Sequence, residues 1–285
     1  MKSRRKILDN LMTAATWASG LALTALVAGI VVFVVLKGYS VLSLEFLLEP
    51  PRDSMTKGGI LTPLVGTIQL VAVAMGFAIP IGVATGLYFA EYAKDDLFTS
   101  ALRLAIRSLA GVPSVVFGLF GLSLFVILFR FGPSLLSAAL TLGCLTLPLM
   151  VTASEQAFLA VPRDYRDASY ALGASKWQTI WKVVLPSAAP TVITGIILSI
   201  GRVAGETAPI MFTGAAFFAP NIARSLFSEV MALPYHIYVL ATAGTFIEET
   251  RGIQYGTVLV LLLLVLGICS VGIFMRSRFR RRMRR

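Results

Sequence analysis

Six long runs without a charged residue constrain this chain more than any other feature. Each run is near or above the ~20 residues that a helix needs to cross about 30 Å of hydrocarbon. Because hydrocarbon offers the backbone no hydrogen-bond partner, a segment that crosses it must be helical. The sequence therefore predicts an all-α membrane protein with six transmembrane helices, at Asn10–Leu36, Gly58–Ala90, Ser108–Phe129, Phe131–Ser154, Val183–Gly201 and Gly252–Met275.

The charges of the chain indicate its orientation. Only 14% of the residues are charged and the mean hydropathy is +0.83, whereas a soluble domain carries about 25% charged residues. Six spans place both termini on one side, and the whole net charge of +11 lies on that side. The positive-inside rule makes this side cytoplasmic. We therefore expect a multi-pass protein of the bacterial cytoplasmic (inner) membrane with both termini in the cytoplasm, whose Arg-rich tail meets anionic lipid headgroups rather than nucleic acid.

The sequence gives no evidence for a nucleotide-binding phosphate loop, a reactive cysteine or a metal site. No GxxxxGK[ST] phosphate loop occurs, so the chain does not bind nucleotide through that motif. Cys144 and Cys269 lie inside apolar runs, where a cysteine is usually a small buried hydrophobe. His236 has no partner at metal-ligand spacing. We therefore expect neither a metal nor another cofactor.

Small residues in the second run predict a close helix contact. Gly82 and Gly86 lie one helical turn apart, a pattern that lets two membrane helices approach closely.

The fourth and fifth runs are joined by a long cytoplasmic loop, residues 155–190, with the form of a docking element. Asp167 can stabilise a helix start, and Gly173 allows a sharp turn at a helix end. Pro186 is expected to end or bend the next helix as it enters the membrane. That helix carries apolar residues at i, i+3, i+4 and i+7, a stripe on one face formed by Trp177, Ile180, Trp181 and Val184. On these grounds alone, an ordinary pair of interfacial helices is the favoured interpretation.

The fifth span contains an acid and a base. Arg202 and Glu206 are spaced i, i+4 on what we expect to be one helix reaching about Thr213. A pair in this order contributes only a few tenths of a kcal/mol, which does not offset burial of two charges. A further interaction is therefore expected. The planar fork of Arg suits an oxyanion. The alternative is a pair that ties this span to a neighbouring helix.

The docking loop resembles a known motif. Asp167-Ala168-Ser169, three residues, Gly173, nine residues, Val183, one residue and Leu185-Pro186 are similar to the EAA loop of ABC importer permeases, E-A-A-x3-G-x9-I-x-L-P. The resemblance implies the type I ABC importer permease fold. It also implies a separate ATPase that performs the hydrolysis and contacts the loop at Asp167, Ala168, Gly173 and Ala174.

A second resemblance concerns the cargo. The run Arg202–Pro209 looks like the RxxGETAP signature of the permeases of phosphate ABC importers, and Glu91-Tyr92-Ala93, the GVPS motif at Gly111 and the LPxxIY motif at Leu233 match as well. The resemblance implies Arg202, Glu206 and Thr207 on the phosphate path. It also implies three partners: a homologous second permease, an ATPase dimer and an extracytoplasmic phosphate-binding protein.

The resulting expectation is a non-catalytic permease subunit with three parts. Residues 1–57 hold the tail, the first span and an outside loop, residues 58–276 form the permease domain, and residues 277–285 form a basic cytoplasmic tail. One alternative is a permease for sulfate, molybdate or phosphonate. Others are a proton-coupled secondary transporter that uses Glu206, and a structural membrane anchor, which would not need the buried charge pair.

Overall fold

The computed structural model describes residues 2–94, 96–242 and 247–282. Within them the chain is almost entirely helical, with a two-stranded antiparallel ribbon that pairs β1 (Pro51–Arg52) with β2 (Lys57–Gly58). The helices are α1 (Lys2–Gly38), α2 (Leu44–Leu48), α3 (Leu61–Glu91), α4 (Leu97–Leu109), α5 (Ser114–Gly121), α6 (Leu135–Leu159), α7 (Arg163–Ala171), α8 (Lys176–Thr179), α9 (Leu185–Gly205), α10 (Ala208–Thr213), α11 (Leu233–Thr242) and α12 (Ile247–Arg282). Two π-helical turns, at Leu122–Leu128 and Ile180–Val184, and two short 3₁₀ turns, at Tyr39–Val41 and Asp53–Met55, complete the elements.

The six expected spans are found as five helices of sufficient length and hydropathy plus one bent pair. The five are α1, α3, α6, the helix that runs from α8 through α9, and α12. The all-α membrane fold is therefore confirmed. The expected basic tail begins as a continuation of α12, and residues 283–285 lie outside the described residues.

The third span is not the straight helix expected over Ser108–Phe129. α4 and the helix formed by α5 with its π-helical turn meet at an angle of 101°. Pro113, which cannot donate a backbone hydrogen bond, directly precedes α5. α4 begins where the Asp96 carboxylate accepts a hydrogen bond from the Thr99 amide, and this bond lowers the pKa of Asp96.

α3 and α6 form the most extensive helix pair in the bundle and hold its main apolar core with α9 and α10. The expected close contact at Gly82 and Gly86 is confirmed. A Cβ atom on Gly82 would lie 2.6 Å from the Met150 Cβ, and one on Gly86 would lie 2.6 Å from the Ser154 Cβ. The two glycines therefore set the distance between α3 and α6.

Gly86→Ala should destabilise the protein by about 1–3 kcal/mol, because the new methyl group meets Ser154 and the backbone of α6. Thermal unfolding in detergent measures the effect. Gly76→Ala is the matched control, since a Cβ atom on Gly76 of the same helix meets nothing within 4 Å. Equal melting temperatures for the two variants would contradict this account of the α3–α6 contact.

Pro186 does not end a helix. One helix runs unbroken for 30 residues from Lys176 to Gly205. The amide of Leu185 bonds to the Ile180 carbonyl, five residues back, so the turn that precedes the proline is wider than an α-helical turn. This π-helical turn accommodates a ring that would otherwise clash with the preceding turn.

The expected apolar stripe, which runs from α8 into the π-helical turn, faces two directions. Ile180 and Val184 are fully buried. Trp177 and Trp181 pack edge to face with their ring centroids 5.4 Å apart and are 60% and 51% exposed. The buried pair fixes this helix to the bundle, whereas the tryptophans form an exposed aromatic surface of the kind found at the membrane–water interface.

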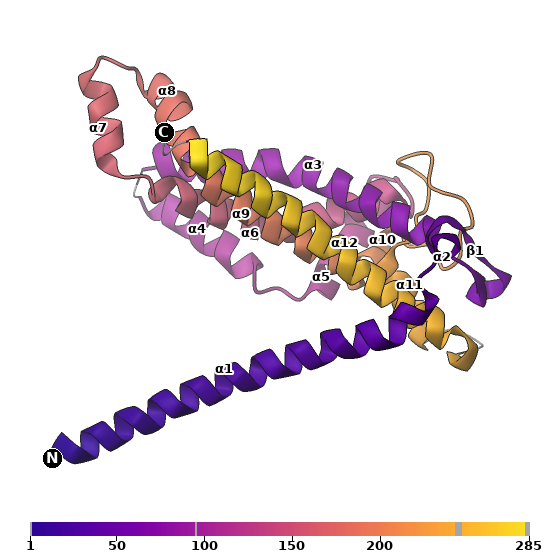
Figure 1. Cartoon of the computed structure of the whole chain (residues 1–285). Coiled ribbons are helices and arrows are strands. Elements are labelled where there is room, and N and C mark those ends of the chain that lie inside the picture. The colour runs from indigo at the N-terminus through magenta and orange to yellow at the C-terminus, as the bar shows by residue number, and fades with distance from the viewer. Residues whose placement is uncertain (1, 95, 243–246, 283–285) are drawn as a thin grey trace.

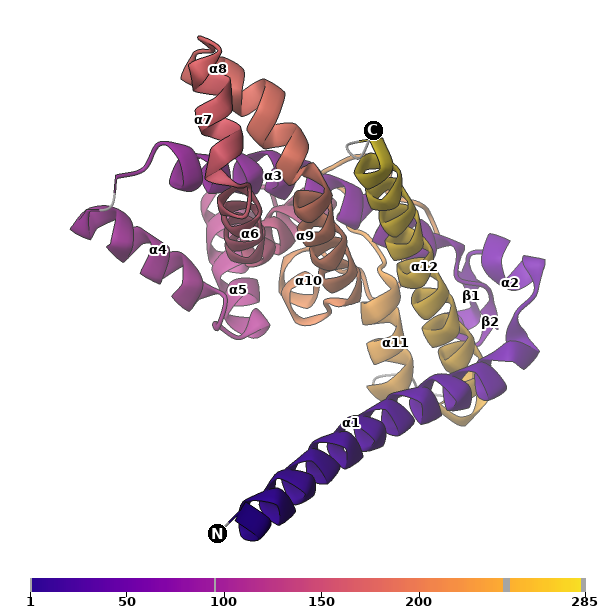
Figure 2. The ribbon, with the colours of Figure 1, turned by 60° about the vertical axis from the view of Figure 1, so that its left-hand side comes forward.

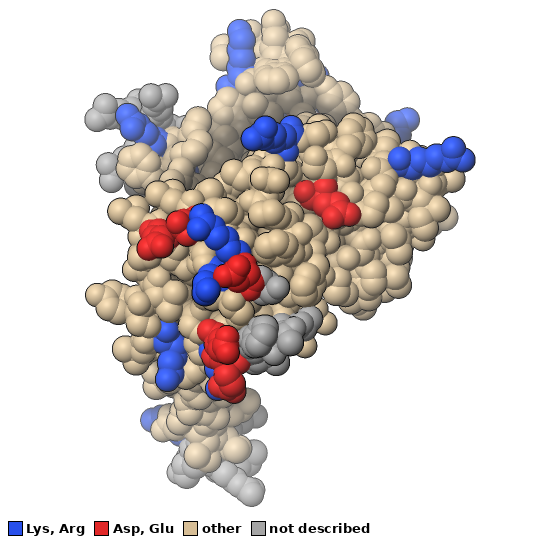
Figure 3. Space-filling model, turned by 90° about the vertical axis from the view of Figure 1, so that its right-hand side faces the viewer, with Lys and Arg blue, Asp and Glu red and all other residues tan. Residues whose placement is uncertain are grey.

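The two ends of the bundle differ. In Figure 1 the hairpin of α7 and α8 lies at the same end as both termini, and α2, β1 and α11 lie at the opposite end. Viewed on that opposite end, Figure 3 shows acidic and basic side chains interspersed. α1 extends away from the bundle, and its most apolar window has no buried residue. The loops therefore fall into two groups, as the sequence predicts.

Candidate translocation and coupling sites

The charge pair of the fifth span lies where a membrane helix breaks. The expected continuous helix to Thr213 is wrong, because α9 ends at Gly205 and α10 begins at Ala208. Glu206 between them is extended, with φ −74° and ψ 135°. Pro209 has no N–H to bond the Gly205 carbonyl, and glycine is a weak helix former, so the helix stops here. Irregular backbone inside a membrane is tolerated where it meets protein or lines a water-filled cavity.

Arg202 and Glu206 still meet across this break. Arg202 Nε donates to Glu206 Oε1 over 3.4 Å, and the two side chains are 36% and 17% exposed. Thr207 follows directly and its carbonyl accepts the Met211 amide, so its backbone starts α10. The three predicted path residues thus lie at the break, and the structure shows a side-chain contact between Arg202 and Glu206.

The guanidinium of Arg202 is only partly engaged. Among the described residues, its terminal Nη1 and Nη2 atoms have no hydrogen-bond partner. Arg166, in contrast, donates from Nε and from both terminal nitrogens to Glu91 and to backbone carbonyls. Arg202 therefore presents two free parallel donors, the arrangement that binds an oxyanion through two hydrogen bonds.

The α7–α8 hairpin presents the predicted coupling residues. Asp167 lies in the middle of α7 rather than at a helix start, and both Asp167 and Ala168 are exposed. Gly173 has φ +80°, which confirms the sharp turn. The Ala174 amide bonds to the Ser169 carbonyl and closes the end of α7. Figure 2 shows the hairpin projecting beyond the ends of α6 and α9, as a docking element requires.

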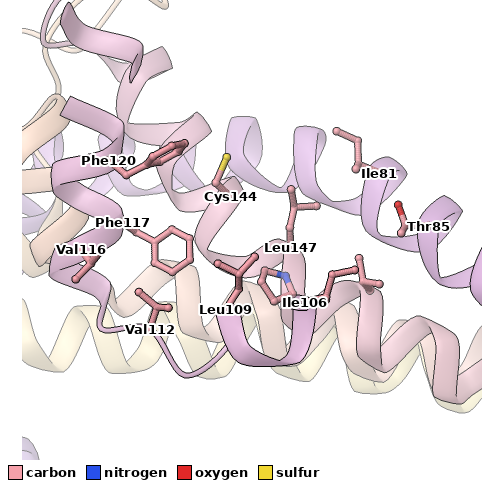
Figure 4. Close-up of a pocket in the computed structure, with 12 residues that line it drawn as sticks. Ile81, Thr85, Ile106, Leu109, Val112, Val116, Phe117, Phe120, Cys144 and Leu147 are labelled. Carbon is pink, nitrogen blue, oxygen red and sulfur yellow. The ribbon is translucent and has the colours of Figure 1, made fainter. Parts of the chain in front are cut away.

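Two cavities lie apart from the charge pair. The larger, about 570 Å³, lies between α3, α4, α5 and α6, and its walls carry apolar residues such as Leu109, Phe117 and Leu147 (Figure 4). Its few polar groups do not suit a phosphate ion. A second cavity of about 520 Å³ lies at the foot of the hairpin beside Tyr165, Lys182 and Thr191.

Sequence reasoning missed two buried ion pairs near the hairpin. Arg166 of α7 contacts Glu91 at the end of α3, and Arg103 of α4 contacts Glu155 of α6. A signal was present, since Glu91 directly ends a long apolar run and belongs to a motif that matches the phosphate permeases. The partners lie 75 and 52 residues away, and no local spacing identifies them.

Comparison with known proteins decides the family. The family described as "Binding-protein-dependent transport system inner membrane component" matches residues 78–285. The chain belongs to this family. It is therefore a multi-pass permease of the inner membrane, as its apolar helices also require.

Curated relatives match over most of the chain. It is 34% identical over 279 residues to the probable ABC transporter permease protein YqgI of Bacillus subtilis, covering 93% of this chain and 95% of that protein. It is also 34% identical to the phosphate transport system permease protein PstA of Mycobacterium leprae, covering 98% and 92%. The chain thus matches ABC transporter permeases over more than nine tenths of its length.

Solved structures share the fold at low sequence identity. A chain of a bacterial alginate ABC transporter aligns with a TM-score of 0.65 and 11% identity, covering 96% of this chain and 95% of that one. A chain of the MetNI methionine ABC transporter aligns with a TM-score of 0.60 and 18% identity, covering 77% and 97%. The type I ABC importer permease fold is therefore confirmed.

Proposed function

We propose that this chain is the permease subunit of an ATP-driven phosphate importer and that phosphate passes Arg202. The observation that carries the proposal is the partly exposed guanidinium of Arg202, held at a helix break with both terminal nitrogens open among the described residues. The PstA relatives, all named as phosphate transport permeases, support the choice of cargo.

Three neighbouring residues would have different roles in binding phosphate at this site. Arg202 offers a fixed positive charge to an anion in a medium of low dielectric constant. Glu206 holds the Arg202 Nε and leaves a second carboxylate oxygen to accept a hydrogen bond from the P–OH group of phosphate. Thr207 lies beside them and supplies a hydroxyl. Phosphate keeps a proton at neutral pH and sulfate does not, so Glu206 would favour phosphate by repelling an anion that cannot donate.

Movement driven by ATP would reach this site from the N-terminal end of the helix that runs from Lys176 to Gly205. An ATPase dimer on the cytoplasmic side would dock against α7 and the Gly173 turn, with Asp167, Ala168, Gly173 and Ala174 at the contact. Leu172 beside the turn is 89% exposed, which suits a surface that a partner covers. The chain itself would catalyse nothing. A second permease would complete the path, a phosphate-binding protein would deliver cargo outside, and both termini would be cytoplasmic.

Competition between oxyanions tests the cargo. Uptake of labelled phosphate by cells that carry only this importer should fall with unlabelled phosphate and persist in equal sulfate, molybdate or phosphonate. Inhibition by sulfate as strong as by phosphate would make the chain a general oxyanion permease.

Glu206→Gln should weaken the discrimination between phosphate and sulfate by about tenfold, because a neutral amide no longer repels a fully ionised anion. The ratio of inhibition constants for the two anions measures this effect. An unchanged ratio in the variant would remove Glu206 from cargo selection and leave it as a tether for Arg202.

A further inference from the structure

Glu91 connects the α7–α8 hairpin to α3, a helix that is not next to the hairpin in the sequence. It is the last residue of α3, its side chain is 6% exposed, and its Oε1 atom accepts hydrogen bonds from Arg166 Nε at 3.1 Å and Nη2 at 2.6 Å. Arg166 belongs to α7, the first helix of the hairpin. A buried ion pair thus ties two segments that lie 75 residues apart.

Arg166 also holds the end of a third helix. Its Nη2 atom donates to the Phe158 carbonyl at 2.9 Å, and its Nη1 atom donates to the Val161 carbonyl at 2.6 Å. The Phe158 carbonyl belongs to the last turn of α6, where backbone acceptors lack the usual intrahelical partners, and the Val161 carbonyl lies two residues beyond the helix. The hairpin would therefore keep its attachment to α6 if the carboxylate of Glu91 were neutralised.

The second helix of the hairpin contacts the same place. Lys176, the first residue of α8, donates from Nζ to the Glu91 carbonyl oxygen at 2.5 Å and lies 4.3 Å from the centre of the Tyr92 ring. Ser169 of α7 and Thr179 of α8 are hydrogen-bonded at 2.9 Å, which joins the two helices of the hairpin to each other. Both helices of the hairpin thus form hydrogen bonds with the last residue of α3.

We propose that Glu91 is a positioning residue that passes hairpin movement to α3. This inference rests on the proposed docking of an ATPase at the hairpin. Movement reaches α9 through the unbroken helix from Lys176, but α3 has no such covalent route. The Glu91–Arg166 ion pair supplies a noncovalent link instead, and the close packing of α3 on α6 carries the movement into the core. The hairpin would then move α3, α6 and α9 as one body.

The chain contains a matched pair for comparison. Glu155 of α6 is 5% exposed and its Oε1 atom lies 2.7 Å from Arg103 Nε, so it is a glutamate of similar burial that is also paired with an arginine. Arg103 belongs to α4 and also donates to the Phe89 carbonyl of α3, so this pair joins α4 to α6 and α3, and neither of its two residues belongs to the hairpin. A purely structural role predicts equal effects for neutralising either glutamate, whereas a transmission role predicts different ones.

The test compares Glu91→Gln with Glu155→Gln in the complete importer reconstituted in lipid vesicles. Phosphate taken up per ATP hydrolysed is measured together with the melting temperature of the complex. Glu91→Gln should lower the uptake per ATP by about fivefold or more while ATP hydrolysis continues, the size of a typical coupling between sites. The two variants should lower the melting temperature by similar amounts. Glu155→Gln should leave uptake per ATP unchanged.

An unchanged ratio in Glu91→Gln, or an equal fall in both variants, would overturn the proposal. If Glu91→Gln fails to assemble, Lys176→Gln decides, because Lys176 is exposed and its loss cannot unfold the core. It should lower the uptake per ATP in the same direction, and an unchanged ratio would again refute the link. A wild-type importer that moves no phosphate would instead contradict the proposed function, so the two failures are distinguishable.

Discussion

Arg202→Ala should reduce phosphate uptake at least about 30-fold while the importer still assembles. The substitution removes the fixed cation at the break between α9 and α10. Truncating one partner of a partly buried charged contact costs about 2 kcal/mol, and each 1.4 kcal/mol is a factor of ten. Glu206 would also be left without its counter-ion, which adds repulsion for an incoming anion. Uptake of labelled phosphate and the amount of complex purified from the same cells measure the two quantities.

Two control variants separate this role from a structural one. Arg202→Lys keeps the charge but loses the planar fork, so uptake should recover in part. Arg251→Gln removes a cation from a surface ion pair with Glu248, 56% exposed, and should leave uptake unchanged. Undiminished uptake in Arg202→Ala would exclude Arg202 from the path.

Ala168→Arg should abolish ATP-dependent uptake by preventing the ATPase from docking. Ala168 is exposed in the middle of α7 and arginine is a good helix former, so the hairpin should keep its fold. A large charged side chain in a close contact costs at least about 2 kcal/mol of binding free energy, which is more than tenfold in affinity. Co-purification of the ATPase with this chain measures the loss.

Ala168→Ser is the control for this site, since its small side chain should leave the docking contact nearly intact. Retention of the Arg166–Glu91 pair in both variants can be followed through their melting temperatures. Normal recovery of the ATPase with Ala168→Arg would show that α7 is not the docking helix.

The sequence was sufficient for the features that depend on local composition and spacing. Uncharged runs predicted the spans because the bilayer imposes a minimum length on each helix. Gly82 and Gly86 predicted a close helix contact because their effect depends only on the missing side chains, and the structure shows that the partner is α6. Gly173 predicted the hairpin turn, since few other residues adopt its positive φ.

The features that sequence reasoning missed depend on how helices end and on which distant segments meet. The break at Gly205 places Glu206 outside α9, although i, i+4 spacing suggests a pair on one helix. The π-helical turn at Ile180–Val184 lets the chain pass Pro186 without a break, because one extra residue widens the turn. The Glu91–Arg166 pair arises only once α3, α6 and α7 pack together.

ATP-driven accumulation of phosphate by the purified complex tests the central proposal most directly. Vesicles containing this chain, its partner permease and the ATPase, with the binding protein outside and ATP supplied to the ATPase, are given labelled phosphate without a proton gradient. We predict accumulation above the external concentration, and we predict its loss when ATP is omitted or Arg202 is replaced by alanine. Accumulation that needs a proton gradient and persists without ATP would instead identify a secondary transporter and contradict the proposal.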